Sequence, residues 1–243
     1  MYANSTDPLG DALTSYIQGD LLSKVVVYRD DGLSEDLMMS RFFQEPSTFT
    51  LVEKTALENC RGRVLDIGGG AGRYSLALQS RGLRVCAIDI SPAAVEIMKR
   101  RGVRDARVAD IFKFEPAQAF DTLLMMMHGI GIVENLAGLE NFLRHASTLI
   151  QFGGQIILDS IDVRCTRNVM HHAYQEVCGR LGRYFGETRL QFEYLGRKGP
   201  SFGWLQIDPK TLADYARRAG WASEVLYWDA GGDYLAGLTR LEG

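Results

Sequence analysis

The stretch VLDIGGGAGRYSLAL, which runs from Val64 to Leu78, decides the fold of this 243-residue chain. A short apolar run ends at Asp66, and four of the next six residues are glycine. A helical pattern follows at once, so the order predicts a strand, a tight turn and a helix N-terminus. Such a turn either lets a ligand approach the backbone or simply connects a strand to a helix with no ligand.

Strand and helix patterns alternate beyond this stretch. Strands are expected at 63–67, 84–90, 106–110, 121–127 and 155–160. The helix after Ser91 has a capping serine, Pro92 in its first turn and Gly102 at its end. A helix from Asn135 is expected to end at the glycine pair 153–154. Alternation of this kind implies crossover connections and a mainly parallel sheet with helices on both faces.

The end of the chain predicts a different connection. Strand patterns near Val225–Trp228 and Tyr234–Thr239 are joined only by DAGGD. So short a link permits an antiparallel hairpin and excludes a parallel crossover. A helix capped by Asp208 precedes this hairpin.

Two segments interrupt the alternation. Residues 161–208 contain a helical pattern near 169–181, and the runs RLQFEYLG and SFGWLQID flank the turn RKGP as a predicted hairpin. The N-terminal segment carries a helical pattern at 7–18 and the strand-like run KVVVY. One domain over 1–243 is the simplest organisation. Its expected parts are an N-terminal extension and lid (1–49), a core with the glycine turn (50–160), an insertion or cap (161–208), and a closing helix and hairpin (209–243).

Composition narrows the function classes. A net charge of -3 argues against a bulk nucleic-acid binder, whose surface must neutralise phosphates. The four cysteines show no C-x-x-C spacing, and free thiols in a reducing cytoplasm are expected. No signal peptide or membrane span is expected. No metal site is expected either, because adjacent residues such as His171 and His172 do not share a helix face.

The glycines do not fit the dinucleotide fingerprint G-x-G-x-x-G. The sixth residue is Arg73 when counted from Gly68, and Ser75 when counted from Gly70. The pattern is instead D-x-G-x-G-x-G, which is similar to the nucleotide-binding motif of class I S-adenosylmethionine-dependent methyltransferases. Asp89 and Asp110 close the second and third predicted strands, where that family places acids near the ribose hydroxyls and the adenine amino group.

The resemblance implies a doubly wound α/β fold. Its seven-stranded, mostly parallel sheet has the order 3-2-1-4-5-7-6 with strand 7 antiparallel, an N-terminal helical lid and a cap after strand 5. It also implies S-adenosyl-L-methionine as cofactor and S-adenosyl-L-homocysteine as product. Each acid alone could be an ordinary turn or cap residue. The expected cofactor-binding residues are Asp66, Gly68, Gly69, Gly70, Gly72, Asp89, Ile90, Asp110, Ile111, Met127 and His128.

The methyl acceptor is less well defined. The chain lacks the [DN]-P-P-[YF] sequence that family members acting on nucleic-acid bases or glutamine often carry after strand 4, and has MMMHGIGIVEN there. His128 in this loop is the candidate catalytic base for a hydroxyl, or it only shapes the loop. Aromatic residues beside arginines in the insertion suit a small planar or anionic acceptor, or pack the hairpin. The candidate acceptor contacts are Tyr16, Arg41, Phe42, Phe43, His171, His172, Tyr174 and Trp204.

The sequence thus predicts a cytoplasmic methyltransferase with a small-molecule substrate, in which O-, N- and C-methylation stay open. We expect the acceptor between the lid, the His128 loop and the insertion. The alternatives are a protein or RNA acceptor, a non-catalytic S-adenosylmethionine-binding module and, less favoured, an NAD-linked oxidoreductase. A homodimer is compatible with the sequence.

Overall fold

Seven strands form the larger of two sheets in the computed structural model, which describes residues 7–166 and 169–241. Its order is β11-β12-β7-β6-β3-β4-β5. The strands are β3 (Arg63–Ile67), β4 (Arg84–Asp89), β5 (Ala106–Val108), β6 (Phe120–Met125), β7 (Ile150–Ile161), β11 (Trp221–Trp228) and β12 (Asp233–Arg240). Strands β3 to β7 are parallel, and β12 is antiparallel to both of its neighbours. This confirms the predicted order 3-2-1-4-5-7-6.

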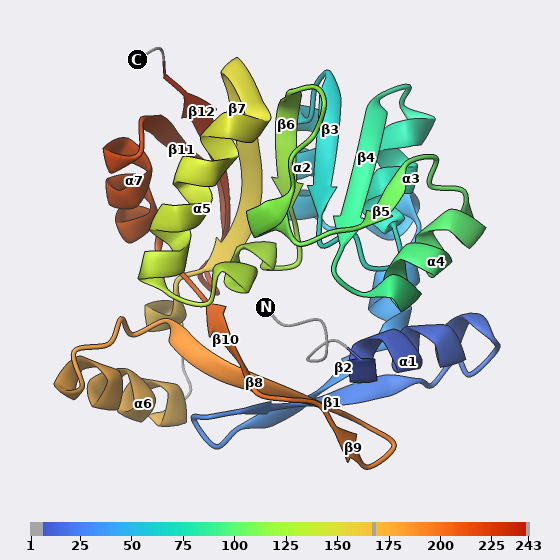
Figure 1. Ribbon diagram of the computed structural model, residues 1–243. Coiled ribbons are helices and arrows are strands. Elements are labelled where there is room, and N and C mark those ends of the chain that lie inside the picture. The colour runs from blue at the N-terminus through green and yellow to red at the C-terminus, as the bar shows by residue number, and fades with distance from the viewer. Residues whose placement is uncertain (1–6, 167–168, 242–243) are drawn as a thin grey trace.

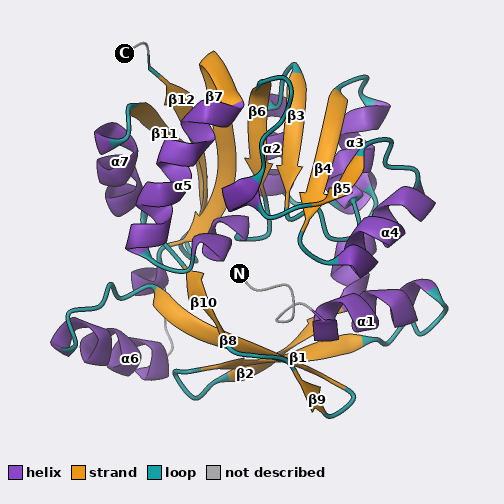
Figure 2. Ribbon diagram, in the orientation of Figure 1, coloured by secondary structure: helices purple, strands orange, loops and turns teal. Residues whose placement is uncertain are grey.

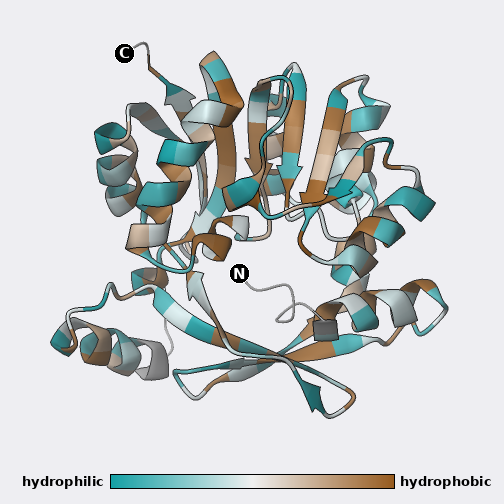
Figure 3. Cartoon of the chain, in the orientation of Figure 1, coloured by the Kyte–Doolittle hydropathy of each residue, from teal (hydrophilic) through white to brown (hydrophobic). Residues whose placement is uncertain are grey.

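Helices cover both faces of this sheet (Figure 1). One face packs against α2 (Leu51–Asn59), α3 (Arg73–Ser80) and α4 (Pro92–Arg101). The other packs against α5 (Leu136–Leu149) and α7 (Pro209–Arg218). The side chains of Ser91, Asn135 and Asp208 cap α4, α5 and α7, as predicted, and each accepts a backbone N–H. Figure 3 shows hydrophobic residues concentrated in the central strands and hydrophilic residues on the helices.

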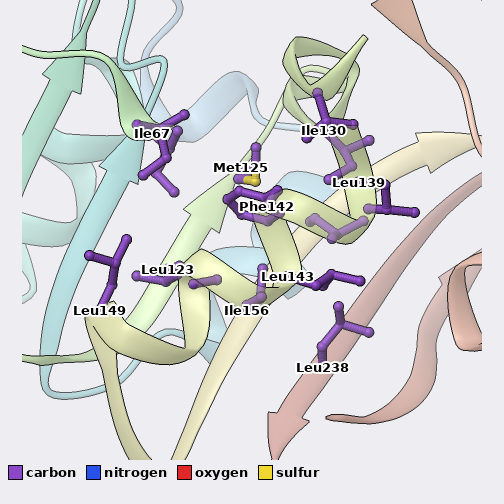
Figure 4. Close-up of a cluster of buried hydrophobic side chains, with 14 of the residues drawn as sticks. Ile67, Leu123, Met125, Ile130, Leu139, Phe142, Leu143, Leu149, Ile156 and Leu238 are labelled. Carbon is purple, nitrogen blue, oxygen red and sulfur yellow. The ribbon is translucent and has the colours of Figure 1, made fainter. Parts of the chain in front are cut away.

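The core on the α5 side is built by alternation along each strand. In β6, Leu123 faces α5 while the next residue, Leu124, belongs to the cluster on the opposite face. Figure 4 shows Phe142 and Leu143 of α5 gathered over β6 and β7 with Ile156. Helix α5 ends at Leu149 rather than at the predicted glycine pair 153–154. Strand β7 begins at once, because Ile150 already pairs with Phe120 of β6.

A second, antiparallel sheet lies across the carboxyl ends of the parallel strands (Figures 1 and 2). Its order is β10-β8-β1-β2, and β9 pairs with β8. The strands are β1 (Lys24–Arg29), β2 (Ser34–Met38), β8 (Glu187–Tyr194), β9 (Arg197–Lys198) and β10 (Phe202–Leu205). The predicted hairpin in the insertion is confirmed, with Phe202 opposite Leu190.

The N-terminal extension is more than a helical lid. Besides α1 (Asp7–Ile17) and the short helices η2 (Met39–Phe43) and η3 (Pro46–Thr48), it contributes β1 and β2. Val27 of β1 pairs with Phe192 of β8, so the two interrupting segments build one sheet together. The remaining elements are η4 (Ile111–Lys113), η5 (Gly129–Val133), η6 (Val163–Cys165) and α6 (Val169–Arg180). Over the described ranges, no helix has the length and apolarity needed to cross a membrane. The single-domain organisation stays a prediction.

Candidate functional site

A cavity of about 940 Å³ lies between the glycine turn and the second sheet. Its walls come from the turn after β3, the ends of β4 and β5, the loop after β6, and β1, β2, β8 and β10. The volume is at the upper end of the range of small-molecule and cofactor sites. Two ligands of moderate size, a cofactor and an acceptor, are therefore compatible with this one cavity.

The glycine turn brings the backbone to the edge of this cavity. Gly68, Gly70 and Gly72 all have positive φ angles, of 72°, 55° and 80°, which explains why glycines alternate in the motif. The lid residue Phe42 lies over Gly70, where a Cβ atom would come within 3.1 Å of its Cδ1 atom. Gly72 does not line the cavity; it lies against Val103 and Met98.

The three predicted acids all line the cavity. Asp66 is buried and accepts a hydrogen bond of 2.5 Å from Ser75 Oγ, and burial raises the pKa of its carboxyl group to about 6. Asp89 accepts Gly70 N–H on one oxygen and Ser91 N–H on the other, both at 2.9 Å. Asp110 caps η4 through Phe112 N–H. Each carboxylate oxygen has a second lone pair, so these local bonds leave acceptor capacity toward the cavity.

The loop after β6 is held by two acids that the sequence analysis did not identify. Met127 and His128 have φ angles of 61° and 57°, which is unusual for residues with side chains. The backbone N–H of His128 donates to Asp159 Oδ1 at 2.8 Å. Its ring atom Nε2 lies 2.9 Å from Asp233 Oδ1. One carboxylate thus fixes the backbone of His128 and another orients its ring.

These surroundings shift the pKa values of His128 and Asp159. Burial alone would lower the pKa of His128, but the hydrogen bond with Asp233 and the charges of Asp159 and Asp233 outweigh it, so the pKa is raised. Burial raises the pKa of Asp159 to about 6, against the opposing charge of His128. Arg41, across the cavity, acts on His128 in the opposite sense to the acids.

Most of the predicted site residues come together at the cavity. Those that line it are Asp66, Gly68, Gly69, Gly70, Asp89, Ile90, Asp110, Ile111, Met127, His128, Arg41, Phe42 and Trp204. The predicted residues that the structure does not bring there are Gly72, Tyr16, Phe43, His172 and Tyr174. The side chain of His171 lies outside the described residues.

Packing explains why the latter residues lie elsewhere. Tyr16 stacks on Phe43 with ring centroids 4.5 Å apart, and the Arg101 guanidinium lies 4.9 Å from the Phe43 centroid, so this pair anchors the lid on α4. In the insertion, Tyr174 donates to the carbonyl of Glu187 and holds α6 against the second sheet. His172 on the same helix is exposed.

Trp204 joins the second sheet to the loop that follows β6. Its indole packs against Gly131 of η5. The preceding residue of β10, Gly203, packs against the side chain of Glu134. A Cβ atom at either glycine would clash with its neighbour. The second sheet, which forms the roof of the cavity, is therefore attached to η5 at Gly131, three residues after His128.

Several lining residues had no motif to reveal them. Asp159 lies near the end of the predicted strand 155–160, as Asp66 and Asp89 lie near the ends of theirs. Asp233 lies in the turn DAGGD, and Arg73 lies at the start of the helical pattern 72–79. Within residues 7–166 and 169–241, no group of three His, Cys, Asp or Glu residues is arranged to hold a metal ion.

The comparisons with known proteins agree with this geometry. Residues 41–223 match the family model described as a methyltransferase domain. A solved structure of a SAM-dependent methyltransferase from Bacteroides fragilis, in complex with S-adenosyl-L-homocysteine, is 33% identical with a TM-score of 0.86, and the match covers 100% of this chain and 98% of that one.

Two curated relatives are also similar. A demethylmenaquinone methyltransferase from Clavibacter sepedonicus is 28% identical over 66% of this chain. A ubiquinone biosynthesis O-methyltransferase from Xanthomonas euvesicatoria pv. vesicatoria (strain 85-10) is 30% identical over 68% of this chain. The matched regions span 66% and 65% of these relatives' own length. With the family match over most of its length and the D-x-G-x-G-x-G turn on its cavity, the chain belongs to the class I S-adenosylmethionine-dependent methyltransferases.

Proposed function

We propose that the protein methylates a hydroxyl group of a small, planar, anionic acceptor. The observation that carries this proposal is the position of His128, which lines the same cavity as the glycine turn and is bonded to Asp233. A histidine held by a carboxylate is suited to remove a proton from a hydroxyl. Family relatives named for O-methylation in ubiquinone biosynthesis and for methylation of demethylmenaquinone support an oxygenated planar acceptor.

The residues at the glycine turn suit the expected cofactor. A cofactor with an ammonium, a carboxylate, a ribose and an adenine needs acids at separate places, and the side chains of Asp66, Asp89 and Asp110 lie in that order along the carboxyl ends of β3, β4 and β5. We assign Asp66 to the ammonium, Asp89 to the ribose hydroxyls and Asp110 to the adenine amino group. Bound S-adenosylmethionine supplies an electrophilic methyl group, so that an oxygen–carbon bond forms as the sulfur–carbon bond breaks and S-adenosylhomocysteine remains.

His128 takes the proton of the acceptor hydroxyl. When Nε2–H donates to Asp233, Nδ1 is the basic nitrogen. The negative charges of Asp159 and Asp233 then stabilise the imidazolium that forms. Asp233 acts through His128 and is a positioning residue.

Arg41 and the aromatic residues support an acceptor with an anionic oxygen. The guanidinium of Arg41 lines the cavity and has no ion-pair partner within the described part of the chain, whereas Arg29 is bonded to Asp31 and Arg73 to Glu53. Trp204 offers a flat surface for a planar ring. Because the second sheet covers the cavity, a small molecule suits the site better than a protein or RNA acceptor.

Incubation with S-adenosylmethionine tests the proposal. We would offer 3,4-dihydroxybenzoate, catechol, a primary-amine analogue of the benzoate, bulk tRNA and a mixture of histones, and follow S-adenosylhomocysteine and the mass of each acceptor. Methylation of the hydroxylated acid at oxygen is expected. Methylation of tRNA or histones alone would overturn the small-molecule assignment, and tight cofactor binding without transfer to any acceptor would favour a binding module.

A cytoplasmic location is part of the same proposal. The thiols of Cys60, Cys86 and Cys178 are buried, which suits a reducing cytoplasm. A homodimer and the lack of nucleic-acid binding stay predictions.

A further inference from the structure

Arg73 sits in a buried polar cluster beside the glycine turn. Its Nη1 donates to Gln44 Oε1 of the lid at 2.5 Å, and its Nη2 contacts Glu53 Oε1 and the Tyr74 hydroxyl. The side chains of Arg73 and Glu53 are only 6% and 9% exposed. The guanidinium also lies 4.4 Å from the Tyr74 ring centroid and 5.3 Å from that of Phe49. Packing and hydrogen bonds therefore fix its orientation.

Glu53 is held as an anion in this cluster. Burial would raise its pKa, but hydrogen bonds from Thr50 and Tyr74 and the charge of Arg73 outweigh it, and the pKa is lowered. Glu53 Oε2 accepts from both the amide and the hydroxyl of Thr50, at 2.7 and 2.8 Å. Both carboxylate oxygens of Glu53 are thus occupied by hydrogen bonds within the cluster.

One donor of this cluster remains unsatisfied. Arg73 Nε is buried and has no hydrogen-bond partner, although an unpaired buried donor of a charged group is costly. Arg73 lines the cavity, and its charge acts on Asp66, the acid assigned to the cofactor's ammonium. A cation with an orphan N–H therefore belongs to the end of the site where the amino-acid part of the cofactor is expected.

The glycine turn offers few amides of its own for that part. The N–H groups of Gly68 and Gly69 both donate to the carbonyl of Ile88, at 2.9 and 3.0 Å. Gly70 N–H donates to Asp89, and Gly72 N–H donates to the carbonyl of Gly69. Since these four amides are already used, a side-chain donor adds to what the turn can offer a carboxylate at this end.

We propose that Arg73 Nε binds the carboxylate of the cofactor's methionine part, and that Gln44 links this contact to closure of the lid, residues 39–48. The inference rests on the cofactor of the proposed function, not on the acceptor. Arg73 and Asp66 then hold the two charges of the zwitterionic tail. Because Gln44 bonds the same guanidinium, the bound carboxylate and the closed lid stabilise each other.

Calorimetry with S-adenosylmethionine and its decarboxylated analogue tests the first part. We expect the wild-type protein to prefer the carboxylate-bearing form by roughly 10–100-fold, the usual effect of a hydrogen bond between charged groups. In the double variant Glu53→Gln/Arg73→Gln, which leaves no unpaired buried charge, this preference is expected to disappear while the analogue binds as before. Glu53→Gln alone retains Arg73 and is the matched control, expected to keep the preference.

Amide hydrogen exchange of residues 39–48 tests the second part. S-adenosylmethionine is expected to protect the lid of the wild-type protein, and the decarboxylated analogue at equal saturation is expected to protect it less. Gln44→Ala should remove this difference but leave most of the affinity preference.

Equal wild-type affinity for the two ligands, or an unchanged preference in the folded double variant, would overturn the role of Arg73. Equal lid protection by both ligands would overturn the link through Gln44. The wild-type comparisons need no variant, so poor folding of the double variant does not protect the proposal. Neither measurement involves an acceptor, so an inactive acceptor panel contradicts the proposed function and leaves this inference standing.

Discussion

Trp204 packs its indole directly against the backbone of Gly131, so that no side chain larger than hydrogen fits between them. This contact joins the second sheet to the loop that carries His128. Gly131 is buried, and the indole that covers it belongs to β10. The position of the cavity roof therefore depends on one glycine in the core.

Gly131→Ala tests this dependence. We expect a loss of about 1–3 kcal/mol in the free energy of unfolding, since added volume in a packed site forces rearrangement. The KM for the acceptor is expected to rise while the Kd for S-adenosylhomocysteine changes little. Gly179→Ala, at a helical glycine with no neighbour near the added methyl, is the control. Normal stability and KM in Gly131→Ala would show that the roof is not anchored there.

Asp89→Asn addresses the cofactor. The amide keeps one oxygen for the local backbone but loses the charge that binds hydroxyl groups. A hydrogen bond to a charged group contributes about 1.5–3 kcal/mol, so calorimetry should show S-adenosylhomocysteine binding weakened by roughly 10–100-fold. Asp105→Asn, at a half-buried acid outside the cavity that is paired with Arg107, is the control. Full affinity in a folded Asp89→Asn protein, or tighter binding of NAD than of S-adenosylhomocysteine, would contradict the assignment.

The pH dependence of methyl transfer reports on His128. The base must be neutral, and its pKa is raised above 6.5, so kcat/KM is expected to rise with pH through that raised pKa and to be lost below it. Asp233→Asn removes a charge that favours the protonated ring, which should shift this rise to lower pH. A pH profile of Asp233→Asn that superimposes on the wild type would exclude the positioning role.

His128→Ala provides the direct test of the base. Turnover is expected to fall by roughly 10²–10⁴-fold, the usual contribution of general base catalysis, with cofactor affinity nearly intact. His172→Ala is the matched control, because this exposed histidine lies outside the cavity. Equal turnover in both variants would show that His128 is not the base and only shapes its loop.

Arg41→Gln tests the chemistry of the acceptor. Without the cation, the KM for 3,4-dihydroxybenzoate is expected to rise about tenfold or more, while that for uncharged catechol stays the same. Arg41→Lys should restore part of the difference, and Arg104→Gln, an exposed arginine away from the cavity, controls for net charge. An equal effect on the KM of both acceptors would mean that Arg41 does not bind the anionic group.

The sequence predicted the larger sheet because its signals are local. Periodic apolar residues define the strands, and Ser91, Asn135 and Asp208 cap helices through atoms only two or three residues away. The glycine motif is equally local, since the positive φ angles of Gly68, Gly70 and Gly72 dictate the residue type. These features carry their meaning within a few residues, so they can be recognised without a tertiary structure.

Only the tertiary structure decided how the site is completed. His128 and Asp233 are 105 residues apart in sequence, and nothing near Asp233 marks it as more than a turn residue. The pairing of Val27 with Phe192 joins two segments, and the apolar pattern of neither segment indicates which strand it pairs with. The same limit placed Tyr174 in the predicted site, although its hydroxyl bonds the carbonyl of Glu187 and the residue does not line the cavity. A periodic pattern specifies which face of an element is buried, whereas the partner of that face is set by long-range packing.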